Sequence, residues 1–381
     1  MPEENETLKA IPTEPIKVPA PDKTKSSNIE DDLDMLWKGE TLNERYLNKE
    51  NTTVFTPDAD HEPATKKYVD DNSLQFGDGS DGDVTVDTDD LTLTRDMYYN
   101  NLTITNGCTI WTAGFRIFVK ETLSIASGCS IERNGNAGSN GQEGGTSVKA
   151  GGVGGAALGA GTLWGGTAGS TGSPSNVAGS GDAGSNGAST TFGCGVAGAR
   201  GGKGGVGDPG YNGGAVGIAG TVTKKALPSD LVTAITMIGY DGTDVSPIEG
   251  SAGSCGGTAG GGCISCLTTN RSGGSGAGAG GSGGIILIVA NTITNNGAIE
   301  TKGGAGGDGG DGDQTSTNSG AGGGGAGGPG GVVILVYRSK SGNNPDVGGG
   351  AGGAGGSGGG TGNNGAAGST GTTGTVITID L

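Results

Sequence analysis

Two stretches decide the fold of this chain: Gly283-Gly284-Ile285-Ile286-Leu287-Ile288-Val289 and Gly330-Gly331-Val332-Val333-Ile334-Leu335-Val336-Tyr337. Each is a continuous apolar run after a pair of glycines, and the runs begin 47 residues apart. A short apolar run bounded by glycine is typical of a strand buried on both faces. A third run, Val376–Ile379, lies near the C-terminus. The sequence therefore predicts a mostly β protein with fully buried strands in its distal part.

A shorter repeat lies upstream, in residues 91–134. Leu102-Thr-Ile-Thr-Asn-Gly-Cys108-Thr-Ile110 aligns with Leu123-Ser-Ile-Ala-Ser-Gly-Cys129-Ser-Ile131 at an offset of 21 residues. Apolar and polar residues alternate in both copies, which indicates half-buried strands. A fixed offset of about twenty residues predicts stacked rungs, in a β-solenoid or a β-sandwich.

The two cysteines of this repeat have a third counterpart. The related copy Ile293–Ile299 places Ala298 where the earlier copies have Cys108 and Cys129. Because alanine carries no reactive group, this substitution indicates a small inward-facing residue. We therefore expect structural roles for both cysteines.

Glycine dominates everything downstream of the repeat. Of the 247 residues from 135 to the C-terminus, 82 are Gly, whereas residues 1–100 contain only four. Collagen is excluded, because this region has only six prolines and no strict Gly-X-Y register. Three alternatives stay open: a bundle of polyglycine II helices, which we favour, a less regular Gly-rich β structure, and disordered loops. Residues 222–238 are the one long Gly-free interlude, a strand or helix lying on one side.

Composition and charge exclude several classes of protein. The formal net charge is −17, and residues 1–100 contain 24 acidic and 10 basic residues, so no basic field is present to bind nucleic acid. No apolar run reaches the length of a membrane span, and the acidic start argues against a secretory signal. With a single histidine, His61, and no convincing pair of carboxylates, we expect no enzyme activity and no cofactor.

Metal binding has weak support. Cys255, Cys263 and Cys266 could begin a zinc site, form a disulfide or remain free thiols, and the spacing leaves these alternatives open. Residues 306–314 lack the alternating apolar positions of calcium-binding nonapeptide repeats. We therefore assign no metal site.

The acidic, Gly-poor leader divides into three parts. Residues 1–28 are rich in proline and predict an extended arm. Residues 29–47 predict a short helix, with Leu33, Leu36 and Trp37 on its apolar face. Residues 77–90 predict a solvated acidic linker.

The middle of the leader carries a recognisable motif. It consists of Asn51-Thr52-Thr53-Val54-Phe55-Thr56-Pro57, followed by Pro63-Ala64-Thr65-Lys66-Lys67-Tyr68-Val69-Asp70. This motif resembles the N-terminal connector of bacteriophage tail, baseplate and head fibres. The resemblance covers about thirty residues and implies a homotrimeric virion fibre that docks on other virion proteins through its N-terminus. The docking and trimerisation candidates are Leu33, Leu36, Trp37, Thr52, Phe55, Pro63, Ala64, Thr65, Lys66, Lys67, Tyr68 and Val69.

The Gly-rich region is similar in composition to the polyglycine-sandwich domain of phage tail-tip adhesins. That resemblance implies that loops between Gly segments contact a bacterial surface glycan or outer-membrane protein. The candidate contact residues are Trp164, Phe192, Tyr211, Asn212, Tyr240 and Asp244, and the wider candidate turns include residues 314–319 and 339–346. Two alternatives are a head fibre or capsid decoration protein, and a polyglycine protein that binds ice or another regular surface.

The predicted organisation has four parts. Residues 1–45 form the docking arm and helix, 46–90 the connector and acidic linker, 91–134 the β-repeat module, and 135–381 the Gly-rich distal domain. The expected location is the virion.

Overall fold

A computed structural model of the chain describes residues 76–163, 165–176, 181–184, 190–193, 202, 204–205, 214–215, 222–225, 271–316 and 318–381. These residues belong to one compact unit, Leu74–Leu381. The described part is rich in strands and contains no α-helix, so no helix in it could cross a membrane. The arm, the short helix and the connector of residues 1–75 lie outside the described residues.

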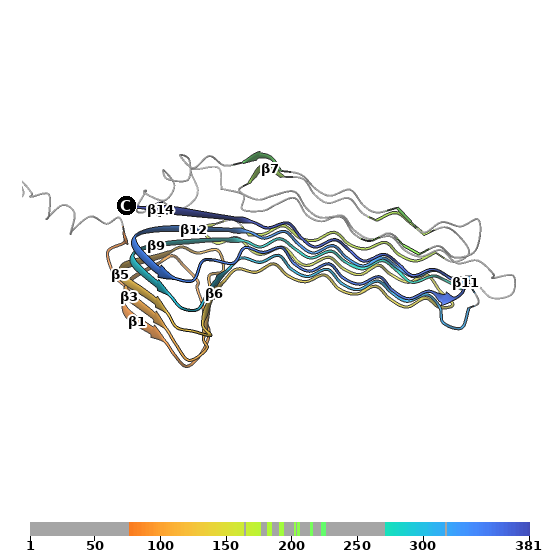
Figure 1. The fold of residues 1–381 in the computed structure, drawn as a ribbon, viewed down its shortest axis with the longest axis horizontal. Coiled ribbons are helices and arrows are strands. Elements are labelled where there is room, and N and C mark those ends of the chain that lie inside the picture. Colours follow the sequence, from red (N-terminus) through yellow and green to blue (C-terminus); the bar gives the residue numbers. More distant parts are fainter. Residues whose placement is uncertain are drawn as a thin grey trace, which may run out of the picture. The chain divides into compact units, whose positions relative to one another are not determined.

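The two larger sheets of the described part consist of parallel strands (Figure 1). The larger sheet has six strands, in the spatial order β1 (Gly82–Val86), β3 (Met97–Ile104), β5 (Ile117–Ile125), β9 (Ile285–Asn295), β12 (Val332–Gly342) and β14 (Thr375–Asp380). The smaller sheet has four strands, in the order β10 (Ala298–Glu300), β6 (Ser130–Glu132), β4 (Thr109–Trp111) and β2 (Leu91–Thr92). Along the chain, each of the first strands of the large sheet is followed by a strand of the small sheet, so the two sheets form successive rungs.

The 21-residue repeat is the rung of this stack, as the sequence predicts. Leu102 pairs with Leu123 in the large sheet, and Ile110 pairs with Ile131 in the small sheet. All four side chains are fully buried in one apolar cluster between the sheets. Cys108 and Cys129 are free and buried in the same cluster, in agreement with their expected structural role.

The third copy of the repeat is in a different register from the one predicted. Ala298 pairs with Ser130, and Ile299 pairs with Ile131. The turn before Ala298 is shorter than the turn before Cys129, so Ala298 does not occupy the cysteine position. The argument from that substitution is therefore wrong, although both cysteines are buried.

The acidic segment 77–90 is also different from the prediction. Residues 82–86 form β1 and pair in parallel with β3, so this segment opens the rung stack. Val86 is buried, whereas Asp83 and Asp87 are exposed. Alternating acids therefore mark the solvent side of a strand, and the linker interpretation is wrong for these residues.

The apolar runs form β9, β12 and β14. In β9 and β12, consecutive residues such as Ile286 and Leu287 are buried, at 0 % and 2 % exposure, because both faces of the sheet are covered. The strand β14 lies at the edge, and its Val376 is 39 % exposed. Full burial was therefore correctly predicted for two runs and wrong for the third. Because β5 pairs with β9, the large sheet crosses the division predicted at residue 135.

Gly-rich segments leave the small sheet and return to the large sheet (Figure 1). We call residues 134–144, 302–313 and 346–358 the outbound layer, since they run away from the sheets. Residues 151–158, 272–284, 319–331 and 361–374 return and form the inbound layer. Residues 165–176 run antiparallel to the inbound layer and bond it. Neighbours within a layer are parallel: the amide of Gly138 donates to Ala305 O, and that of Ala277 to Gly323 O.

Backbone hydrogen bonds join these segments with a period of three residues. In segment 272–284, the amide of Ser275 donates to Gln142 O at 3.0 Å, that of Gly276 to Ser173 O at 3.0 Å, and that of Ala277 to Gly323 O at 3.1 Å. The next three amides repeat the order, to residues 139, 170 and 326. Three successive residues thus bond three different neighbouring segments.

A Gly-rich segment at the edge of the array, which has fewer neighbouring segments, has fewer glycines in each of its three-residue repeats. Segments 272–284 and 319–331 are buried throughout and consist of Gly, Ala and Ser with one Pro. The outbound segments 303–311 and 349–357 read Gly-Gly-X, and their X residues are exposed. The edge segment 362–374 reads Gly-X-X, with both X residues exposed. Each position of a triplet therefore faces one direction, and where a neighbouring backbone lies in that direction the residue is Gly or, less often, Ala, Ser or Pro.

Close approach, and not backbone conformation, requires these glycines. A Cβ on Gly325 would lie 2.0 Å from Gly278 O, and a Cβ on Gly353 would lie 1.8 Å from Gly307 O. Neither glycine has a positive φ. An L-residue could adopt their backbone angles, but its side chain would collide with the adjacent segment.

This constraint gives a matched pair of substitutions. Gly325→Ala should destabilise the protein by about 3 kcal/mol or more, because overpacking of a close-packed interior costs about 1–3 kcal/mol and here the obstacle is backbone. Gly159→Ala adds the same methyl group where nothing lies within 4 Å, so it should be neutral. Urea unfolding followed by circular dichroism measures both. Equal midpoints for the two variants would contradict the steric argument.

Candidate binding surface

The structure does not bring the predicted contact residues together. Trp164, Tyr211, Asn212, Tyr240 and Asp244 lie outside the described residues. Phe192 lies in β7 (Thr190–Gly193), which pairs in parallel with β8 (Val222–Lys225), and only the backbone of these strands is described. All twelve docking and trimerisation candidates belong to residues 1–75 and also lie outside the described part.

Two of the predicted contact turns lie at opposite ends of the Gly-rich array. Residues 314–319 connect an outbound to an inbound segment and include β11 (Asn318–Ser319), which pairs with β13 (Gly359–Gly360) at the end far from the sheets (Figure 1). Residues 339–346 lie at the sheet end, where β12 ends and Asp346 forms a parallel bridge with Glu300. They cannot act as one surface.

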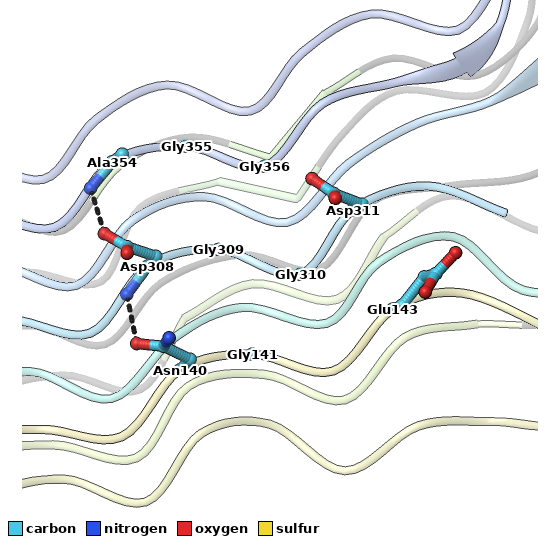
Figure 2. Close-up of a pocket in the computed structure, with 10 residues that line it drawn as sticks. All are labelled: Asn140, Gly141, Glu143, Asp308, Gly309, Gly310, Asp311, Ala354, Gly355 and Gly356. Carbon is cyan, nitrogen blue, oxygen red and sulfur yellow. Dashed lines mark hydrogen bonds between the residues drawn. The ribbon is translucent and has the colours of Figure 1, made fainter. Parts of the chain in front are cut away.

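The outbound layer presents a regular row of side chains to solvent. Asn140 Oδ1 accepts a hydrogen bond from the Asp308 amide at 2.8 Å, and Asp308 Oδ1 accepts one from the Ala354 amide at 2.7 Å (Figure 2). Three residues further along, Asp311 Oδ1 accepts from the Ser357 amide at 2.6 Å. Side-chain oxygens thus take the role of the backbone carbonyls that accept these bonds inside the array.

A shallow groove of about 370 Å³ runs across this row (Figure 2). Its side chains include three carboxylates, of Glu143, Asp308 and Asp311, and no basic group. Such a surface can accept hydrogen bonds from hydroxyl or amino groups. The carboxylates do not converge: within the described ranges, no three His, Cys, Asp or Glu residues are placed to hold a metal ion.

Sequence reasoning did not single out Asn140, Asp308 or Asp311. The available signal was the Gly-Gly-X triplet in segments 303–311 and 349–357, which marks X as outward-facing. Which segments are neighbours cannot be read from one sequence, so the row across the segments was not predictable.

An ion pair closes the far end of the array. Arg271 precedes an inbound segment and Asp313 ends an outbound segment, and Arg271 Nη1 lies 2.6 Å from Asp313 Oδ2. Asp313 Oδ1 also accepts bonds from the amide of Thr315 at 2.9 Å and from its hydroxyl at 2.7 Å. Burial opposes ionisation of this carboxyl, but the bonds from Thr315 and Arg271 outweigh it and hold its pKa below the ordinary value.

Comparison with known proteins does not assign a role to this surface. Neither the known protein-family models, nor the curated proteins, nor the solved structures contain a match to this chain. Its function must therefore be argued from its own residues.

We expect the Asp313 carboxylate to make a pH-dependent contribution to the free energy of unfolding. A carboxyl whose pKa is lowered by folding stabilises the protein above its unfolded pKa of about 3.9, and the contribution is lost as the pH falls through the folded pKa. Asp313→Asn should therefore cost about 1–3 kcal/mol at pH 7, and this difference should shrink at pH 3. Urea unfolding at both pH values measures it.

Asp308→Asn is the control for that experiment, because Asp308 is exposed and has no basic partner among the described contacts. It should change stability by less than about 0.5 kcal/mol at either pH. A destabilisation by Asp313→Asn that is equal at pH 7 and pH 3 would contradict the role of the charge.

Proposed function

We propose that this chain is a bacteriophage virion fibre that attaches through its N-terminal leader and presents its Gly-rich region to the host surface. The observation that carries the proposal is the motif of residues 51–57 and 63–70, which resembles the connector of phage fibres. In this proposal, Tyr68 and Val69 pack around the three-fold axis of a homotrimer. The function is adhesion, with neither catalysis nor a cofactor.

The arrangement of the described residues supports this direction of the fibre. Phe76, the first described residue, packs against the large sheet. Its ring also lies under the guanidinium of Arg338, which follows the buried residues of β12. The paired strands β11 and β13 lie at the other end of the Gly-rich segments. In this proposal the chain enters the compact unit at the sheet end, and the turns at the far end contact the host surface.

We also propose that the Gly-rich segments are polyglycine II helices. A helix of three residues per turn without internal hydrogen bonds directs successive amides outward in three directions. The period-three bonding of segment 272–284 is what such a helix requires. A rigid array of this kind would hold the contact turns at a fixed distance from the virion.

The proposed partner is a bacterial surface glycan or outer-membrane protein. The far-end turns carry exposed polar side chains, such as Gln314, Thr315 and Thr361, which can exchange hydrogen bonds with sugar hydroxyls. Three copies of a weak site can raise avidity by about 10²–10⁴ over a single site. A head fibre, the structural alternative, would use the same leader on the capsid.

The oligomeric state tests the leader. Light scattering of the full chain should give about three times the chain mass of 36.6 kDa. Replacing Tyr68 and Val69 by Ser should reduce the assembly to monomers, whereas replacing Asp58 and Asp60, which are not among the trimerisation candidates, by Asn should leave trimers. A monomeric unmodified chain would contradict the trimeric fibre.

Adsorption tests the function itself. The purified full chain should compete with virions for adsorption to host cells, and the combined change Gln314→Ala and Thr361→Ala in the far-end turns should reduce competition at least tenfold. A matched change of exposed edge residues, Thr370→Ala and Thr373→Ala, should leave it unchanged. Gold-labelled antibody should mark the tail; labelling of the capsid without any competition would favour the head fibre.

A further inference from the structure

Arg133 carries a positive charge into the interior of the protein. It directly follows β6, where the small sheet passes into the outbound layer (Figure 1). Its side chain points toward the large sheet, because Ile131, two residues earlier, belongs to the cluster between the sheets. Only 9 % of Arg133 is exposed. A Cβ on Gly284 would lie 2.5 Å from Arg133 Cγ, so the stem of the arginine lies directly against the end of an inbound segment.

None of the described residues supplies a counter-charge for Arg133. The one hydrogen bond of its side chain within the described ranges runs from Nη2 to Gly159 O. Its Nε is also buried and has no hydrogen-bond partner there. The adjacent acids Glu132 and Glu300 alternate to the opposite face of the small sheet, where both already have polar partners.

The buried guanidinium remains charged. Burial lowers the pKa of Arg133, and no carboxylate among the described residues offsets this effect. An arginine side chain nevertheless keeps its proton in proteins. Because a buried charge without a partner is far more destabilising than a paired one, a negative group beside Arg133 would stabilise the fold.

Two threonines with unpartnered hydroxyls flank Arg133. The ladders of the small sheet continue one residue beyond its strands: the amide of Thr112 donates to Glu132 O at 3.2 Å, and that of Arg133 to Glu300 O at 2.8 Å. This register places Thr112 and Thr301 on either side of Arg133. Both are fully buried, and the hydroxyl of each has no hydrogen-bond partner among the described residues. Each, like Arg133, lies two positions after a buried isoleucine of the cluster between the sheets.

We propose that Arg133, Thr112 and Thr301 form an internal binding site for a small inorganic anion. Three neighbouring strands thus place three buried hydrogen-bond donors without partners in one row. The anion accepts hydrogen bonds from Arg133 Nε and from at least one of the two hydroxyls, and it supplies the counter-charge. A water molecule could accept the same bonds, but it would leave the charge uncompensated, so an anion fits the site better.

The proposed anion has a structural role. It would stabilise the place where the rungs pass into the Gly-rich segments, since Arg133 contacts both the small sheet and the inbound segment that ends at Gly284. The proposal is independent of the proposed function, because it concerns the folded chain by itself.

The dependence of stability on the anion gives the first test. After dialysis of the full chain, its thermal midpoint should be several degrees higher in sodium bromide than in sodium gluconate, whose anion is too large for the site, at equal ionic strength. Arg133→Met should abolish this difference. The control Lys120→Met removes an exposed positive charge and should preserve it. Equal midpoints of the unmodified chain in the two salts, or a difference that Arg133→Met leaves unchanged, would overturn the proposal.

Anomalous diffraction gives a second test that needs no variant. Crystals of the full chain grown in sodium bromide, measured at the bromine absorption edge, should show a peak within hydrogen-bond distance of Arg133 Nε. A water molecule without anomalous signal at this position, or a carboxylate of the chain itself, would overturn the proposal. Bromide peaks only on the protein surface would do the same.

Discussion

The close approach of backbone to backbone governs this structure. In the Gly-rich array, amides bond carbonyls of adjacent segments at about 3 Å, and at glycines such as Gly325 the space between segments does not admit a Cβ. Glycine loses more conformational entropy on folding than any other residue, so ordering these segments is costly. The cost is offset only because each interior segment bonds several neighbours at once. The array is therefore stable as a whole, and a single Gly-rich segment is not.

The β rungs fix the register of that array. Inbound segments 272–284 and 319–331 run without interruption into β9 and β12, and Val332 pairs with Ile285 directly after the last glycines. The amide of Gly283 donates to Pro329 O, so the same register continues from the sheet into the glycines. Apolar burial in the rungs thus aligns segments that have almost no side chains with which to align themselves. The two parts form one structure. The large side chains of the rungs fix the register, and the lack of side chains in the Gly-rich segments lets their backbones pack closely.

Much of the β part could be predicted from the sequence, because its signals are local. The apolar runs and the 21-residue offset give strands and rungs directly. Two errors came from context: the acids around Val84 and Val86 concealed a half-buried edge strand, and a shortened turn moved Ala298 by one position. The outward row of Asn140, Asp308 and Asp311 could not be predicted, since it depends on which distant segments become neighbours. The contact residues proposed from aromatic and polar loops remain predictions.

The period of three also restricts how such a protein can change in length. Inserting one residue into an interior segment would rotate every amide beyond it by a third of a turn, away from its partner. Segments can therefore lengthen only in steps of three residues. For the polyglycine II helices that we propose, each step adds about 9 Å, since such a helix rises about 3.1 Å per residue. Because each segment bonds neighbours in both layers, the outbound and inbound limbs would have to gain a step together. During evolution, the array can therefore change its length only by gaining or losing whole three-residue steps in all of its segments.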